Sequence, residues 1–95
     1  MSENILRDKM EQLLKSYLRS LALQTRSNME VTQRIMSERY VMAENSYSAL
    51  ESGDYMCGTL TTVFLLADQP DPTATLKDIK EKLEKLREEE LITLW

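Results

Sequence analysis

The chain has 95 residues, 42% hydrophobic and 29% charged, which suits one small folded domain and is too short for two. Its formal net charge is -4, with 12 Lys and Arg against 16 Asp and Glu, so no protein-wide positive field attracts nucleic acid or an anionic membrane. It contains no His and one Cys, which excludes His-centred catalysis, an internal disulfide and a Cys/His zinc site.

The residue types predict no catalytic site, metal site or cofactor. The carboxylates have no accompanying His, ligand cluster or Gly-rich phosphate loop. The first twenty residues carry charges at helical intervals, where a signal peptide would have an unbroken apolar run. No apolar stretch approaches the roughly 20 residues that a membrane span needs. We therefore expect a cytoplasmic protein that is not an enzyme and has no membrane partner.

Apolar residues spaced by threes and fours predict a long first helix from about Asn4 to Thr25. The polar cluster at 26–28 breaks this pattern. Thr32 is then placed to cap a second helix from Gln33 to Tyr40, because a Thr hydroxyl accepts a hydrogen bond from a first-turn amide.

Two further short helices are predicted in the middle of the chain. One runs from Glu44 to Ser52 and ends at Gly53, since glycine suits the left-handed conformation after a helix. The other is the apolar segment from Leu60 to Ala67. No strand is predicted, so the fold class is all-α: a compact helix-turn-helix domain of about four helices with an extended first helix.

Two prolines predict the end of this domain at residue 69 and a linker at 70–74, because proline lacks an amide donor. From Thr75 to Trp95 the pattern predicts an amphipathic, coiled-coil-like oligomerisation helix. Its apolar residues follow the 3-4-3 spacing of a heptad seam at Leu76, Ile79, Leu83 and Leu86. Two heptads need a partner surface, which is either a second chain, giving a homodimer, or the body of the same chain.

The segment 31–53, VTQRIMSERYVMAENSYSALESG, resembles the repressor and Cro-like (XRE-type) helix-turn-helix family. The matching positions are Val31, Thr32, Gln33, Met36, Ser37, Met42, Tyr47, Ser48, Leu50, Glu51 and Gly53. The later LTTVFLLA is similar to the fourth helix of that family. The likeness covers about half the chain and implies a DNA-binding regulator that presents one helix to the major groove.

The resemblance also implies roles for individual residues. Phosphate contacts are implied for Thr32, Gln33 and Ser46. Arg34 is assigned to phosphate as well, because it is one of the few cations near this segment. Base contacts are implied for Glu44, Asn45 and Ala49. An ion pair between Arg26 and Glu51 is implied as a structural feature. The alternative for each exposed side chain is a solvated helix residue without a partner.

The departures from the family pattern bear on function. Val41 replaces the glycine usual in the turn, where a β-branched residue with positive φ is strained, and Ala43 replaces the Ser or Thr cap. Residues 1–42 carry seven basic and five acidic side chains, whereas residues 43–72 carry five acidic side chains and no basic one. Because Lys and Arg supply most non-specific DNA affinity, the segment with the recognition helix should hold DNA weakly.

Two hypotheses follow from these patterns. The first is a transcriptional regulator that binds double-stranded DNA as a homodimer. The second is a protein-interaction module on the same fold, in which the acidic third helix has lost DNA affinity and the terminal helices bind a protein partner. The fold alone does not decide between them.

Overall fold

The first helix, α1, spans Ser2–Met29 and forms the long axis of the molecule. The computed structural model describes residues 2–94, and the side chains of residues 4–90 within them. The helix was expected to end at Thr25, and that boundary is wrong. Residues 26–28 stay helical because Arg26 bonds to Glu51 and to the carbonyl of Val31, which holds the last turn against the domain. Glu30, with φ of 56°, then ends the helix.

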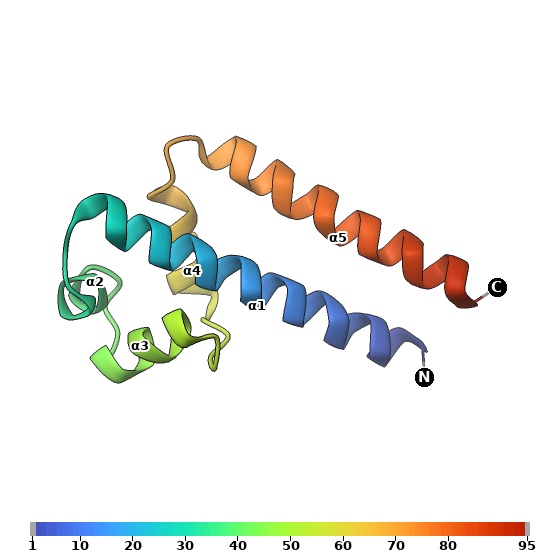
Figure 1. Ribbon diagram of the computed structural model, residues 1–95, viewed down its shortest axis with the longest axis horizontal. Coiled ribbons are helices and arrows are strands. Elements are labelled where there is room, and N and C mark those ends of the chain that lie inside the picture. Colours follow the sequence, from blue (N-terminus) through green and yellow to red (C-terminus); the bar gives the residue numbers. More distant parts are fainter. Residues whose placement is uncertain (1, 95) are drawn as a thin grey trace.

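Helix α3 (Glu44–Ser52) packs against the C-terminal half of α1, and α2 (Gln33–Arg39) packs against α3 (Figure 1). The hydroxyl of Thr32 accepts a hydrogen bond from the Ile35 amide at 3.2 Å, so the predicted cap is confirmed. Gly53 takes the expected left-handed conformation after α3, with φ of 84°. A Cβ there would lie 3.1 Å from the Arg19 side chain, so both conformation and space favour glycine.

Helix α4 (Thr59–Ala67) completes the core against α1. Each of the first four helices contributes side chains to a single cluster of buried residues. The members of that cluster are Leu18, Ala22, Met36, Tyr40, Tyr47, Leu50, Cys57 and Leu65. Residues 2–94 contain five helices and no strand, so the predicted all-α class is confirmed.

The last helix, α5, spans Pro72–Leu94 and begins earlier than expected. The carboxylate of Asp71 accepts a hydrogen bond from the Ala74 amide at 3.1 Å and so caps the helix, while Pro72 occupies its first position. Proline is well tolerated there because that amide has no partner within the helix. Pro72 therefore starts a helix, and the linker expected at 70–74 is partly helical.

Helix α5 runs antiparallel to α1 within the same chain (Figure 1). Tyr17 donates to the carboxylate of Asp78 at 2.7 Å, and Lys9 pairs with Glu90 at 2.6 Å nearer the chain ends. Burial, the bond to Asp78 and its charge raise the pKa of Tyr17 to about 12. These two contacts hold α5 against the N-terminal part of α1.

This packing changes the status of the predicted dimer seam. Ile79 is only 8% exposed because its own chain covers it. The prediction that Ile79 is free to contact a second chain is therefore wrong. Leu83 and Leu86 are half-buried, while Leu76 remains 52% exposed. The apolar faces of α1 and α5 cover each other, as in the alternative of a helix folded back on its domain. In the part of the chain described, no helix is long and apolar enough to cross a bilayer.

The turn between α2 and α3 contains the strained residue that the sequence indicated. Val41 has φ of 54° and a 75% exposed side chain. A non-glycine residue in this region costs about 1–2 kcal/mol, and the greater freedom of glycine in the unfolded chain offsets part of that cost. We expect Val41→Gly to raise the free energy of unfolding by about 0.5–1 kcal/mol, measured in urea. Val41→Ala, which keeps Cβ, is the control and should not stabilise. Equal gains from both variants would contradict backbone strain as the cause.

Candidate nucleic-acid interface

One buried carboxylate, that of Glu51, bonds the helix-turn-helix unit to α1 in addition to the apolar core. Its side chain is 4% exposed, and Arg26 donates to both of its oxygens, at 2.6 and 2.9 Å. Gln33, at the start of α2, donates its amide to the same carboxylate at 3.0 Å. Glu51 therefore joins α1, α2 and α3, and the ion pair with Arg26 that the family resemblance implies is present.

Burial and hydrogen bonding act on Glu51 in opposite directions. Burial disfavours the charged carboxylate, but hydrogen bonds from Arg26, Tyr47 and Gln33 together outweigh it and hold the pKa of Glu51 below its ordinary value. The carboxylate consequently stays ionised at neutral pH. An ionised Glu51 keeps the N-terminus of α2 at a fixed place relative to α3.

Two side chains expected at phosphate, those of Thr32 and Gln33, lie at the start of α2. Each already makes one hydrogen bond within the protein. Gln33 has two amide N–H donors, of which the bond to Glu51 uses one. The Thr32 oxygen accepts from Ile35, which leaves its O–H free to donate. Each of these residues can therefore give one hydrogen bond to an outside acceptor.

The other two residues expected at phosphate differ in exposure. Arg34 has a side chain that is 69% exposed and lies 3.8 Å from Glu38 on the same helix, a distance at which an exposed ion pair contributes little. Ser46, on α3, is half-buried. Arg34 is thus the more accessible of the two.

The residues expected at the bases lie on the outer side of α3. Glu44 and Asn45 are exposed in its first turn, and Ala49 is half-buried one turn after Asn45. Asn45 and Ala49 share one face because they are four residues apart. Ala43 makes no side-chain cap, so the first amides of α3 have no side-chain acceptor from that position.

The acidic charge of residues 43–72 is smaller at the surface than in the sequence. Two of the five acidic side chains, Glu51 and Asp68, are paired with Arg26 and Arg39. The Asp68 carboxylate accepts two bonds from Arg39, at 2.8 and 2.5 Å, and one from the hydroxyl of Tyr40 at 2.8 Å. The bond from Arg39 is the main cause that lowers the pKa of Asp68. Sequence reasoning missed this cluster because its partners are 28 and 29 residues apart.

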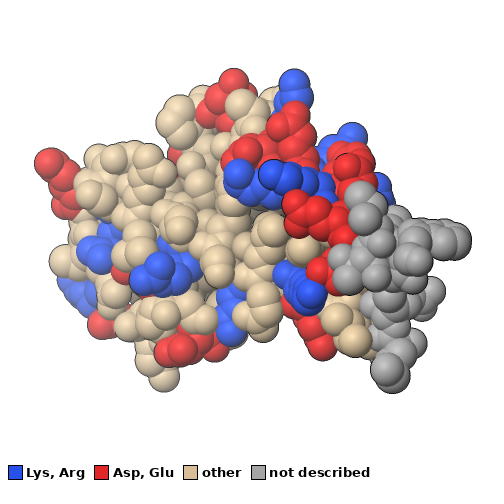
Figure 2. Space-filling view, turned by 45° about the vertical axis from the view of Figure 1, so that its right-hand side comes forward, with Lys and Arg blue, Asp and Glu red and all other residues tan. Residues whose placement is uncertain are grey.

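The same pairing offsets the charge of two cations. The half-buried Arg26 pairs with Glu51 and the exposed Arg39 pairs with Asp68, which leaves the exposed Arg34 and Arg19 as cations near the helix-turn-helix unit that do not pair with these two acids. Figure 2 shows the basic side chains of one face in separate groups among acidic and uncharged ones. The structure therefore brings the expected phosphate and base residues to neighbouring helix starts without surrounding them with a basic surface.

Among the described residues, no group of three His, Cys, Asp or Glu side chains could hold a metal ion. Comparison of the chain with family models, with curated proteins and with solved structures finds no match in any of the three.

Proposed function

We propose that this chain is a cytoplasmic, double-stranded DNA-binding transcription regulator that acts as a homodimer and places α3 in the major groove. The observation that carries the proposal is the bond between Glu51, near the end of α3, and Gln33, the first residue of α2. Gln33 at the start of α2 donates to the buried Glu51 carboxylate, so this bond joins the start of α2 to α3. Such an arrangement holds a phosphate contact at a set distance from a base-reading helix.

In this proposal, the polar residues of the two helices divide into two roles. Thr32, Gln33, Arg34 and Ser46 donate to phosphate oxygens and orient the domain. Asn45 bonds to N6 and N7 of an adenine, Glu44 accepts from N4 of a cytosine, and Ala49 touches a thymine methyl. Sequence preference then depends on α3, and non-specific affinity on the few cations.

The charge distribution predicts an unusual salt dependence. If Arg19 and Arg34 are the only cations of each copy that reach phosphate, a dimer neutralises about four phosphates. The logarithm of the binding constant should then fall with the logarithm of salt concentration at a slope of about -4. Binding would depend more on base contacts than is usual for a DNA-binding dimer.

The test is binding to duplexes selected from a random library, measured across a salt series. Asn45→Ala should lose about 10-fold in preference at a single base pair while binding to random DNA stays the same. Asn4→Ala, the control, replaces an exposed Asn at the far end of α1. It should leave the base preference and the binding to random DNA unchanged. Absence of any retardation of DNA at low salt would overturn the proposal.

A second candidate function is a protein-interaction module on the same fold. The observation that favours it is the exposure of large apolar side chains on α4, where Leu60 is 60% and Val63 is 55% exposed. Apolar surface of this kind is typical of protein contacts and gives nothing to DNA phosphate. This candidate predicts a protein that fails to bind DNA at low salt.

A further inference from the structure

Helix α4 presents an apolar ridge to solvent. Its inner side chains are buried, with Leu65 at 0% and Thr61 at 7% exposure. On its outer side, Leu60 is 60%, Val63 is 55% and Phe64 is 36% exposed. These three residues follow the spacing of one helix face and form what we call the α4 ridge. Phe64 stacks on the buried Tyr40 with ring centroids 6.1 Å apart, so this part of the ridge is held in place.

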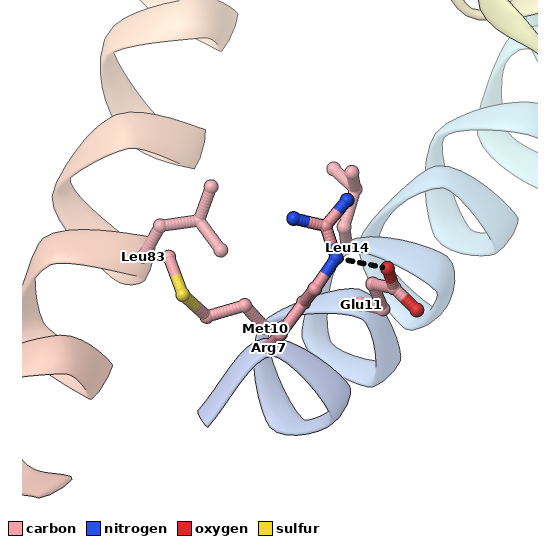
Figure 3. A pocket seen from close by; sticks show the side chains of 5 residues that line it. All are labelled: Arg7, Met10, Glu11, Leu14 and Leu83. Carbon is pink, nitrogen blue, oxygen red and sulfur yellow. Dashed lines mark hydrogen bonds and ion pairs between the residues drawn. The ribbon is translucent and has the colours of Figure 1, made fainter. Parts of the chain in front are cut away.

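A groove of about 480 Å³ runs beside this ridge, between α4 and the N-terminal half of α1. Its apolar lining includes Leu14, Met56, Cys57 and Val63, and we call it the α1–α4 groove. It shares Leu14 with a smaller hollow of about 190 Å³ that extends toward Leu83 of α5. Figure 3 shows this smaller hollow, with Met10 directed toward Leu83. The α4 ridge and the α1–α4 groove therefore lie side by side, and Val63 belongs to both.

Both features are electrically neutral. The sequence of α4 contains no charged residue, and the charged pair in the groove, Arg7 and Glu11, lies 3.2 Å apart, so the two charges offset each other. Figure 3 shows this pair on α1, joined by a dashed line. In a twofold interface each patch meets a copy of itself, so that like charges near the axis repel. A neutral ridge beside a neutral groove can meet a copy of itself without such repulsion.

We propose that the occupant of this surface is a second copy of the chain, with the α4 ridge of each protomer seated in the α1–α4 groove of the other. Packing ridges of one helix into a groove of its neighbour is the usual way for helices to associate. A stable interface buries about 800 Å² on each partner. The reciprocal arrangement buries both a ridge and a groove on every protomer, whereas a ridge-to-ridge contact buries the ridge alone.

This interface differs from the α5 seam, where Ile79 is already buried in its own chain. The proposed interface also deepens the DNA-binding proposal, because a twofold DNA site needs two copies of the protein. It rests on that proposal in this respect alone. Its test contains no DNA. A monomeric protein that still binds DNA, or a dimer that does not, would separate the failure of one proposal from that of the other.

The experiment is sedimentation equilibrium on the full chain over a wide concentration range. The wild type should be a dimer, and Val63→Glu should raise its dissociation constant about 100-fold, because a charge is placed at the centre of an apolar contact. Ile35→Glu is the matched control, since Ile35 is 42% exposed on α2, outside this surface. It should dimerise like the wild type.

Circular dichroism checks that each variant keeps its helices. If Val63→Glu does not fold, Leu60→Glu decides, because Leu60 lies on the ridge and is 60% exposed. A wild type that is monomeric at all concentrations would overturn the proposal. So would a dimer that survives both ridge substitutions, or one that dissociates only with Leu76→Glu on α5.

Discussion

Replacing Arg26 with methionine is expected to lower the free energy of unfolding at pH 7 by about 3 kcal/mol. The substitution keeps much of the side-chain volume and removes both bonds from the guanidinium to Glu51. Breaking a buried ion pair by removing one partner typically costs about 3–5 kcal/mol, since the other charge stays buried. We place the cost at the lower end because Gln33 still donates to Glu51. Urea denaturation measures the change.

The pH dependence provides a control for this mechanism. In the wild type the pKa of Glu51 is lowered, so its contribution is present above the unfolded pKa of about 4.3 and is lost as pH falls through the folded value. In Arg26→Met, burial without the guanidinium should raise the pKa of Glu51 above its ordinary value, so protonation stabilises that variant as pH falls from 7 to 4. The cost of the substitution should therefore shrink on acidification.

The partner substitution, Glu51→Gln, should cost less than Arg26→Met. Arg26 is 29% exposed and can turn to water, whereas the Glu51 side chain is 4% exposed. The double variant should be more stable than the sum of the two single losses indicates, because neither charge remains buried alone. An Arg26→Met cost that is equal at pH 7 and pH 4 would contradict an uncompensated Glu51 charge as its cause.

Leu65→Ala is expected to destabilise the fold by about 3 kcal/mol, because truncating a fully buried leucine loses apolar contacts and leaves a cavity. Leu65 is 0% exposed and belongs to the core cluster. In a domain of this size the loss should lower the melting temperature by roughly 12–24 °C. Thermal unfolding at low protein concentration is the measurement, so that association does not add to stability.

The matched control lies on the same helix. Leu60→Ala makes the same change at a position that is 60% exposed, and it should cost less than about 0.5 kcal/mol. Similar losses at both positions would mean that the α4 ridge is covered within the monomer. That result would also remove the basis for a second copy docking there.

Local sequence pattern predicted much of the fold. The cap at Thr32 and the left-handed Gly53 follow from short-range chemistry, since each depends on residues within one turn. The positive φ of Val41 is what the family resemblance implies, since glycine is usual at this place in the turn. These features are decided locally, so they can be inferred without knowledge of distant contacts.

The boundaries were less predictable for the same reason. The last turn of α1 is stabilised by Arg26 bonding to Glu51, which lies 25 residues away. The start of α5 depends on Asp71, which caps the helix. This signal is local, but proline more often indicates the end of a helix, so the sequence alone predicts a later start. Helix ends are weakly determined by propensity, so one long-range bond or one cap moves them.

The candidate site shows the same division. The sequence by itself determined which residue types stand at the two helix starts, and that residues 43–72 carry acid and no base. Only the tertiary structure decided that two of those acids are neutralised by Arg26 and Arg39, that Ile79 is covered by its own chain and that the α4 ridge is not. The physical reason is that charge pairing and burial depend on which surfaces meet in space. Periodicity shows that a helix has an apolar face, and packing decides what covers that face.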